Sequence, residues 1–280
     1  MPPPTPPPHV LIIAGLDPGG GAGLAADLKT LAALGCYGRA AVTAITVQNS
    51  REVRGISVLD AKLFQDQLNC LADDFPPLIM KIGMLGNAAI VEQVARFLER
   101  VRPEQVVLDP VLAASAGPNL LDEKGKETLR RRLLPLAGII TPNLAEAAAL
   151  SGLPVGAAEQ MEPAARALHR LGARQVIITG GHLEKPQDLY FDGETAVWLG
   201  GERVRTPHIH GAGCTFSTAL AAFLALRKPM PDAAVLAKAY VMAALRHAYP
   251  MGQGPGPLNH FFRLNENRIN FDPAAPEDHG

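Results

Sequence analysis

Short apolar runs alternate along the chain with longer stretches in which apolar residues recur at helical spacing. A run that is apolar along its whole length indicates a strand buried on both faces. Alternation of such strands with amphipathic helices is typical of a mostly parallel sheet that is covered by helices on both sides. The pattern predicts strands at Val10–Ala14, Ala40–Val47, Leu78–Ile82, Gln105–Leu108, Gly138–Thr141 and Gln175–Thr179, with edge strands at Leu189–Leu199 and Arg203–Pro207.

Helical spacing occupies most of the chain between these strands. It predicts helices at Ala25–Leu34, Ala61–Asp73, Ala88–Arg100, Glu123–Leu134, Leu144–Ser151, Pro163–Leu171, Thr215–Leu226 and Pro231–Ala248. We therefore expect one α/β domain at residues 9–264, with a proline-rich tail at 1–8 and a C-terminal tail at 265–280. Binding sites in such sheets lie beyond the carboxyl ends of the strands.

Composition narrows the function classes. The 280 residues carry a formal net charge of −1, so no overall field attracts nucleic acid or an acidic membrane surface. No apolar run reaches the roughly 18 residues of a membrane-spanning helix, and the proline-rich start does not resemble a secretory signal. The three cysteines have no paired spacing, which argues against a disulfide framework or a structural zinc site. We expect a cytoplasmic protein that acts on a small molecule.

A glycine-rich loop at 15–23 follows the first predicted strand, with five glycines in nine residues. Either it is a flexible turn or its backbone approaches a ligand closely. A Rossmann fingerprint is formally present from Gly21, but six residues separate it from the strand end at Ala14. The second predicted strand also ends at Gln48 rather than beside the acid that would bind a ribose. No P-loop motif occurs.

A second glycine cluster, at 210–215, opens a strongly helical stretch. Free backbone N–H groups and the positive end of the helix dipole suit a transferring phosphoryl group. Cys214 lies in this turn, where it could remove a proton from an acceptor hydroxyl. We expect the helix terminus to lower the pKa of its thiol toward neutrality. The alternative is a small buried thiol at the start of a helix.

Several motifs together resemble one family. The run AGLDPGGGAGLAADLKT is similar to AGSDSGGGAGIQADLKT, and AVTAITVQNS is similar to VITALTAQNT. The motifs KIGML, LDPV, TPNLAEA and GGHL follow in the family's order, and HGAGC is close to HGTGC. Over residues 9 to 260 the chain resembles the hydroxymethylpyrimidine/phosphomethylpyrimidine kinases. The resemblance implies a ribokinase-like fold, a homodimer, and use of ATP and Mg²⁺. It also implies phosphorylation of 4-amino-5-hydroxymethyl-2-methylpyrimidine, and then of its monophosphate, in thiamine biosynthesis.

The resemblance also implies a set of site residues. The pyrimidine would contact Gln48, whose amide pairs with a ring nitrogen and an exocyclic amine side by side, and Asp17, Gly15, Asp27, Met84 and Val111. Cys214 would be the base, and Gly211, Ala212 and Gly213 the anion hole. Nucleotide phosphates would lie near Asn143, Thr179, Gly181 and Thr215, and Mg²⁺ near Asp109 and Glu146.

Structural alternatives remain open for several of these residues. Asp27 fits a first-turn helix acid equally well, and Asn143 with Glu146 has the spacing of a helix capping box. Met84 is equally consistent with a core residue. For Gln48 the alternative is a residue of a strand-end loop, although the resemblance favours pyrimidine binding.

The chain departs from the family at two lysines. Thr179 stands where the family commonly has the lysine of KGGH, and Ser115 where it has the lysine of DPVMVAKSG. A lysine near the phosphates would offset transition-state charge, so the second phosphorylation is the step these changes affect most. Substitute cations could be Lys185, Arg39 or Arg54. The competing functions are a pyridoxal or pyridoxine kinase, a non-catalytic pyrimidine sensor and a Rossmann oxidoreductase.

Overall fold

The structure, a computed structural model, describes residues 5–114 and 117–263. Within them one sheet has the strand order β3-β2-β1-β4-β5-β6-β7-β8-β9. Neighbouring strands from β2 to β7 run parallel, while β3, β8 and β9 are antiparallel to their neighbours. The strands are β1 (His9–Leu16), β2 (Tyr37–Gln48), β3 (Val53–Val58), β4 (Ile79–Ile82), β5 (Gln105–Leu108), β6 (Ile139–Ile140), β7 (Gln175–Ile178), β8 (Gln187–Phe191) and β9 (Ala196–Gly200).

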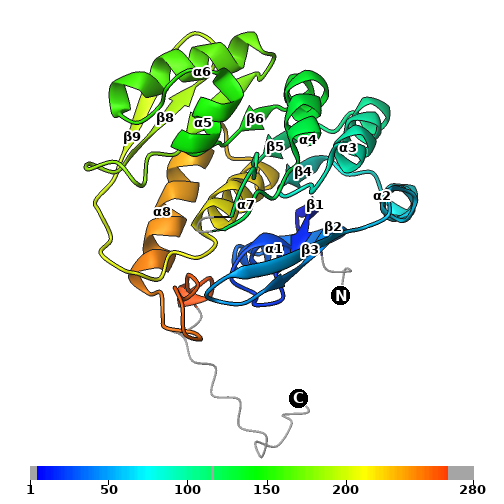
Figure 1. Ribbon diagram of the computed structural model, residues 1–280, viewed down its shortest axis with the longest axis horizontal. Coiled ribbons are helices and arrows are strands. Elements are labelled where there is room, and N and C mark those ends of the chain that lie inside the picture. Colours follow the sequence, from blue (N-terminus) through cyan, green and yellow to red (C-terminus); the bar gives the residue numbers. More distant parts are fainter. Residues whose placement is uncertain (1–4, 115–116, 264–280) are drawn as a thin grey trace, which may run out of the picture.

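Helices cover both faces of this sheet (Figure 1). They are α1 (Gly23–Ala33), α2 (Ala61–Asp74), α3 (Ala88–Val101), α4 (Glu123–Thr128), α5 (Leu144–Ser151), α6 (Met161–Arg170), α7 (Ala212–Ala225) and α8 (Asp232–Arg246). One buried core joins the sheet to α2, α3, α5 and α6, and a second joins it to α1, α7 and α8. The predicted α/β class, with a mostly parallel sheet between two helical layers, is confirmed.

Alternation along β4 places a charge inside the second core. Met80 and Ile82 pack with α2 and α3, whereas Ile79 packs on the opposite face. Side chains of a strand alternate between faces, so Lys81 points the same way as Ile79, toward α1 and α7. The pattern of a central strand therefore directs one lysine into a helix-covered interior.

The structure contains one strand that was not predicted, and three predicted elements differ from it. The strand β3 was missed, and it forms an antiparallel hairpin with β2. Such a hairpin replaces the helical crossover that a Rossmann fold needs after its second strand. The predicted strand Leu189–Leu199 is two strands, because Asp192 accepts hydrogen bonds from the N–H groups of Glu194 and Thr195 and so makes a turn.

The predicted strand Arg203–Pro207 is wrong. The chain leaves the sheet after β9, which is the edge strand, and residues 201–206 have no strand partner. Gly201 instead packs on α8, where a Cβ atom would lie 2.9 Å from Lys238 Cε. The predicted helix Glu123–Leu134 is α-helical only up to Thr128. It continues as a wider π turn and then as a tighter 3₁₀ turn that ends at Leu136. Pro135, in this last turn, cannot donate a helical hydrogen bond.

No helix among the described residues is long and apolar enough to cross a membrane. The tails predicted at 1–8 and 265–280 lie partly or wholly outside the described residues, as does Ser115.

Candidate active site

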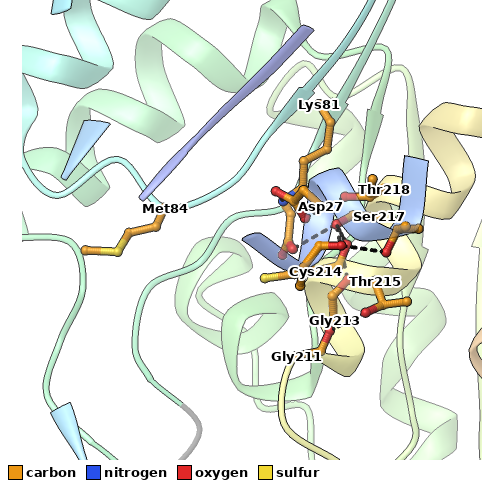
Figure 2. A network of polar contacts seen from close by, with 12 residues as sticks. Asp27, Lys81, Met84, Gly211, Gly213, Cys214, Thr215, Ser217 and Thr218 are labelled. Atoms are coloured by element: carbon orange, nitrogen blue, oxygen red, sulfur yellow. Dashed lines mark hydrogen bonds and ion pairs between the residues drawn. The ribbon is translucent and has the colours of Figure 1, made fainter. Parts of the chain in front are cut away.

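A buried ion pair lies at the centre of the second core. Lys81 Nζ is 2.8 Å from Asp27 Oδ2, and both side chains are fully buried. The hydroxyl of Thr218 donates to the other oxygen of Asp27 at 2.7 Å. From the preceding position of α7, Ser217 donates to Asp109 Oδ2 at 2.9 Å. Figure 2 shows these contacts gathering α1, β4 and the first turns of α7 around one point.

The charges in this cluster are unequal. Burial alone would lower the pKa of Lys81, but Asp27, Cys214 and Asp109 outweigh it and raise that pKa, so the lysine stays charged. Burial raises the pKa of Asp27 and of Asp109, although Lys81 opposes the effect in both cases. One positive charge therefore faces two buried carboxyl groups and a half-buried thiol.

The thiol of Cys214 does not behave as expected from its position near a helix start. Burial raises its pKa to about 12, and the carboxylates of Asp109 and Asp27 act in the same direction. Lys81 and the Gly23 backbone oppose this effect without overcoming it. The predicted lowering is therefore wrong, because desolvation and neighbouring negative charge outweigh the helix terminus. Cys214 is half-buried and is a neutral thiol in this state.

The two glycine-rich loops meet at Gly211. This residue precedes α7 with φ +87°, a conformation that favours glycine. A Cβ atom built on it would overlap the carbonyl oxygen of Gly21 in the first loop. The hydroxyl of Thr215 donates to the Gly211 carbonyl at 2.8 Å, which closes the turn. Ala212 and Gly213 follow as the first helical residues, so the predicted anion-hole segment does lie at a helix start.

We expect Gly211→Ala to destabilise the protein by on the order of 2 kcal/mol or more, because a side chain here adds left-handed backbone strain to a clash with Gly21. Gly213→Ala is the matched control, since a Cβ atom at Gly213 meets nothing within 4 Å. Thermal unfolding of both variants measures the difference. Equal melting temperatures would show that the two loops separate without cost.

A buried histidine, His260, contacts the threonine that closes this turn. The Oγ1 atom of Thr215 is 3.1 Å from His260 Nε2, and His260 is 3% exposed. Burial lowers the pKa of His260 to about 4, and the charge of Lys29 contributes in the same direction. This histidine is therefore neutral at physiological pH.

That histidine makes stability depend on pH. Below about pH 6.5 the unfolded chain binds a proton at His260 that the folded protein does not, so stability is lost as pH falls toward 4. The loss amounts to at most about 3 kcal/mol for this residue. In His260→Gln that part of the slope should disappear, and urea unfolding at pH 7, 6 and 5 measures it. A variant whose slope equals that of the wild type would rule out His260 as the source.

A separate cavity of about 310 Å³ opens beside the first loop. Asp17, Gln48 and His210 line it together with residues of both glycine-rich loops and the segment around Met251. Asp17 accepts hydrogen bonds from the N–H groups of Gly19 and Ala22, at 2.8 and 3.0 Å, and lies 2.9 Å from His210 Nε2. The cavity therefore brings together two of the predicted substrate residues, Asp17 and Gln48.

The other predicted substrate residues lie outside this cavity lining. Asp27 is not a first-turn acid, since it is fully buried against Lys81. Met84 is 7% exposed and lies apart from the cluster in Figure 2. A Cβ atom at Gly15 would lie 2.8 Å from Met84 Sδ, so these two residues pack together. Val111 is partly exposed and lies two residues after Asp109.

The capping box that was left open as an alternative is present. Asn143 Oδ1 accepts from the Glu146 N–H at 3.0 Å, and Glu146 Oε2 accepts from the Asn143 N–H at 2.9 Å. Burial, followed by the nearby charge of Asp109, raises the pKa of Glu146 to about 8. No group of three His, Cys, Asp or Glu side chains with metal-binding geometry occurs among the described residues. A magnesium ion fits here only with one or two carboxylate ligands, Asp109 and Glu146, which is its usual requirement.

Three of the predicted nucleotide residues lie at neighbouring strand ends, whereas Thr215 is fully buried in α7. Thr179 and Asn143 form an isolated bridge, and Gly181 is exposed beside them. The sequence offered three substitute cations, and two are engaged elsewhere. Arg39 lies near the amino-terminal end of β2, opposite the strand ends that carry the site, and donates to the carbonyls of Leu71 and Phe75. Arg54 pairs with Glu52 at the surface.

The structure places a lysine that the sequence analysis missed near Gly180. Lys238 Nζ is 2.8 Å from Asp188 Oδ2, and Asp188 Oδ1 accepts from the Gly180 N–H at 3.0 Å. Lys238 comes from α8, far along the chain, so no local pattern could have revealed it. Lys81 was also missed, although a lysine inside the apolar run LIMKI was a visible signal.

The profile of the family described as phosphomethylpyrimidine kinase matches residues 17–259. The chain belongs to this family. The hydroxymethylpyrimidine/phosphomethylpyrimidine kinase of Haemophilus influenzae is 45% identical over 260 residues, which cover 90% of this chain and 96% of the relative. The thiamine biosynthesis bifunctional protein ThiED of Geobacter sulfurreducens is 43% identical over 267 residues. These residues are 95% of this chain but only 54% of that relative, so the chain spans about half its length.

Two solved structures show the same architecture. The pyridoxal kinase of Bacillus subtilis, in an ADP complex, matches with a TM-score of 0.86 and 39% identity, over 92% of this chain and 100% of that one. The phosphomethylpyrimidine kinase of Clostridium difficile matches with a TM-score of 0.76 and 34% identity, over 85% and 99%. The family fold is thus shared by kinases that are named for two different aromatic substrates.

Proposed function

We propose that this protein transfers the γ-phosphoryl group of ATP to 4-amino-5-hydroxymethyl-2-methylpyrimidine, and then to the resulting monophosphate, in thiamine biosynthesis. One observation carries the proposal. A glycine turn at the start of α7 holds Cys214 near the buried Lys81–Asp27 pair, while Gln48 and His210, the residue before this turn, line one cavity. Membership of the phosphomethylpyrimidine kinase family supports the choice of substrate.

Each group then has a chemical role in the proposal. The amide of Gln48 binds the ring, and Asp17 shapes the loop around it through its bonds to Gly19 and Ala22. Cys214 removes the proton of the acceptor hydroxyl, while backbone N–H groups at Gly211, Ala212 and Gly213 hold the transferring phosphoryl oxygens. Asn143, Thr179, Gly181 and Thr215 lie along the nucleotide phosphates. Asp109 and Glu146 would hold a magnesium ion, which neutralises phosphate charge when bound.

A second candidate function is pyridoxal phosphorylation. The Bacillus subtilis pyridoxal kinase, with its TM-score of 0.86, supports it. Pyridoxal also carries a hydroxymethyl group on an aromatic ring, so the same base and anion hole would serve. Hydroxymethylpyrimidine remains the first choice because the relatives named for it match nearly the full chain at higher identity.

The deciding experiment is a coupled ADP-release assay with ATP and Mg²⁺, in which hydroxymethylpyrimidine, its monophosphate and pyridoxal are offered separately. We expect turnover of both pyrimidines. Turnover of hydroxymethylpyrimidine alone would show that the missing lysines matter for the anionic acceptor. Turnover of pyridoxal alone would move the second candidate to first place. Ligand binding without any ADP release would favour the non-catalytic sensor.

The proposal includes a homodimer. Ile45 and Val47 point from the same face of β2 and are 47% and 60% exposed, although β2 is otherwise largely covered. A second copy of the chain would remove this apolar surface from water. Sedimentation velocity of the wild type measures the oligomeric state, and a single monomeric species would contradict this part of the proposal.

A further inference from the structure

The amide of Gln48 lies between two polar side chains that have no role in the account above. On one side its Oε1 atom is 3.1 Å from the hydroxyl of Thr46, which also lies 3.1 Å from the carbonyl oxygen of Leu16. On the other side its Nε2 atom is 3.4 Å from His210 Nε2. Thr46 is 4% exposed and His210 borders the cavity. The orientation of the amide therefore depends on where its neighbours carry their protons.

Asp17 determines whether His210 Nε2 acts as a hydrogen-bond donor or acceptor. Its carboxylate accepts two backbone N–H groups and lies 2.9 Å from His210 Nε2. Burial alone would raise the pKa of Asp17, but the hydrogen bonds from His210, Gly19 and Ala22 hold that pKa below its usual value. An ionised carboxylate only accepts hydrogen bonds. The proton between the two residues therefore belongs to Nε2 of His210, which is a donor.

A donor at His210 fixes the amide of Gln48. The oxygen and nitrogen of an amide have nearly the same shape, so the hydrogen-bond network decides which is which. With the amide nitrogen toward His210, the N–H groups of Gln48 and His210 would face each other. The single hydroxyl proton of Thr46 would also have to serve two acceptors, the amide oxygen of Gln48 and the carbonyl oxygen of Leu16. After a half-turn the amide oxygen faces His210 and its nitrogen donates to Thr46, which donates to Leu16. The Nε2–H group of His210 is then shared between Asp17 at 2.9 Å and the amide oxygen at 3.4 Å, and no two donors face each other.

We propose that Thr46 and His210 are positioning residues that hold the Gln48 amide in this one orientation, and that they thereby select the hydrogen-bond pattern of the acceptor ring. The inference rests on the proposed function. A 4-aminopyrimidine presents an accepting ring nitrogen beside a donating amine, and the amide matches it with one N–H and one oxygen lone pair. The 4-oxo analogue presents the reverse order, a donating ring N–H beside an accepting oxygen.

The ring cannot compensate by turning over. Its hydroxymethyl group must face Cys214 for phosphoryl transfer, so the edge that meets Gln48 is fixed. Only rotation of the amide would accommodate the 4-oxo ring, and that rotation would place a second donor against His210. Discrimination between the two rings is thus a property of Thr46 and His210 as well as of Gln48.

Calorimetric titration with hydroxymethylpyrimidine and with its 4-oxo analogue tests this inference without requiring turnover. We expect the wild type to favour the amino ring by about tenfold or more, the effect of one lost hydrogen bond. Thr46→Val, which keeps the shape but removes one of the two side chains that hold the amide, should reduce this preference by about threefold. Thr46→Ser should restore the preference. Thr30→Val is the matched control, because Thr30 is a buried threonine that bonds only the Ala26 carbonyl of its own helix.

An unchanged preference in a folded Thr46→Val protein would overturn the inference while leaving the proposed function intact. A wild type that binds both rings equally would also overturn it. A wild type that binds neither ring would overturn the proposed function together with the inference. If Thr46→Val does not fold, His210→Ala tests the other side of the amide and should relax the preference in the same way.

Discussion

Replacing Lys81 with methionine is expected to lower the free energy of unfolding by about 3–5 kcal/mol, the usual cost of removing one partner from a buried ion pair. Both Lys81 and Asp27 are fully buried at 2.8 Å, so Asp27 would be left without a counter-charge. Asp109 and Cys214 would lose the same positive charge, which opposes the rise in their pKa values. We also expect phosphoryl transfer to be lost. Urea unfolding followed by circular dichroism measures the stability change.

Two further variants test whether the loss of stability comes from the buried ion pair. Lys62→Met removes an exposed lysine that pairs with Asp66 at 2.6 Å, and it should cost less than about 1 kcal/mol. Adding Asp27→Asn to Lys81→Met removes the stranded charge, so it should recover a large part of the lost stability without restoring activity. If Lys81→Met and Lys62→Met cost the same, the buried pair does not stabilise the fold.

The alternation of strands and helices was predictable because it depends on local patterns. Helix Leu144–Ser151 was predicted with its observed bounds, since Asn143 and Glu146 cap it at a fixed spacing. β3 was missed because its sequence, VRGISV, carries an arginine and a glycine and is stabilised by pairing with β2. The strand predicted at Arg203–Pro207 is wrong for a related reason. A strand forms only where another strand pairs with it, and the local sequence does not identify that partner.

Some features of the candidate site could likewise be predicted from local sequence, and others could not. The meeting of Asp17 with Gln48 beside the second glycine turn follows from their positions after neighbouring strands, which is why sequence and structure agree there. The pKa of Cys214 could not be predicted, because burial raises it most and the carboxylates of Asp109 and Asp27 raise it further, and only the fold produces both effects. Burial and long-range charge set the chemistry of this thiol, whereas local sequence sets only its place at a helix start.

Replacing Cys214 with alanine is expected to lower kcat by about 10²–10⁴-fold, the usual contribution of a positioned general base, with little change in the KM for ATP. The wild-type rate should also rise with pH between 7 and 9. With a pKa raised to about 12 by burial, only a small fraction of the thiol is ionised in that range, and the fraction grows about tenfold per pH unit. Steady-state ADP release at several pH values measures both effects.

The alanine variant should lose this pH dependence together with the rate, because no thiol remains to ionise. Cys70→Ala is the matched control, since Cys70 is an exposed thiol on α2 and should affect neither quantity. Cys214→Ser should keep the fold but remain slow, because a hydroxyl at this buried position ionises even less readily than a thiol. A Cys214→Ala enzyme with the wild-type rate and slope would show that another group takes the proton. The pH profile would then have to be assigned to that group.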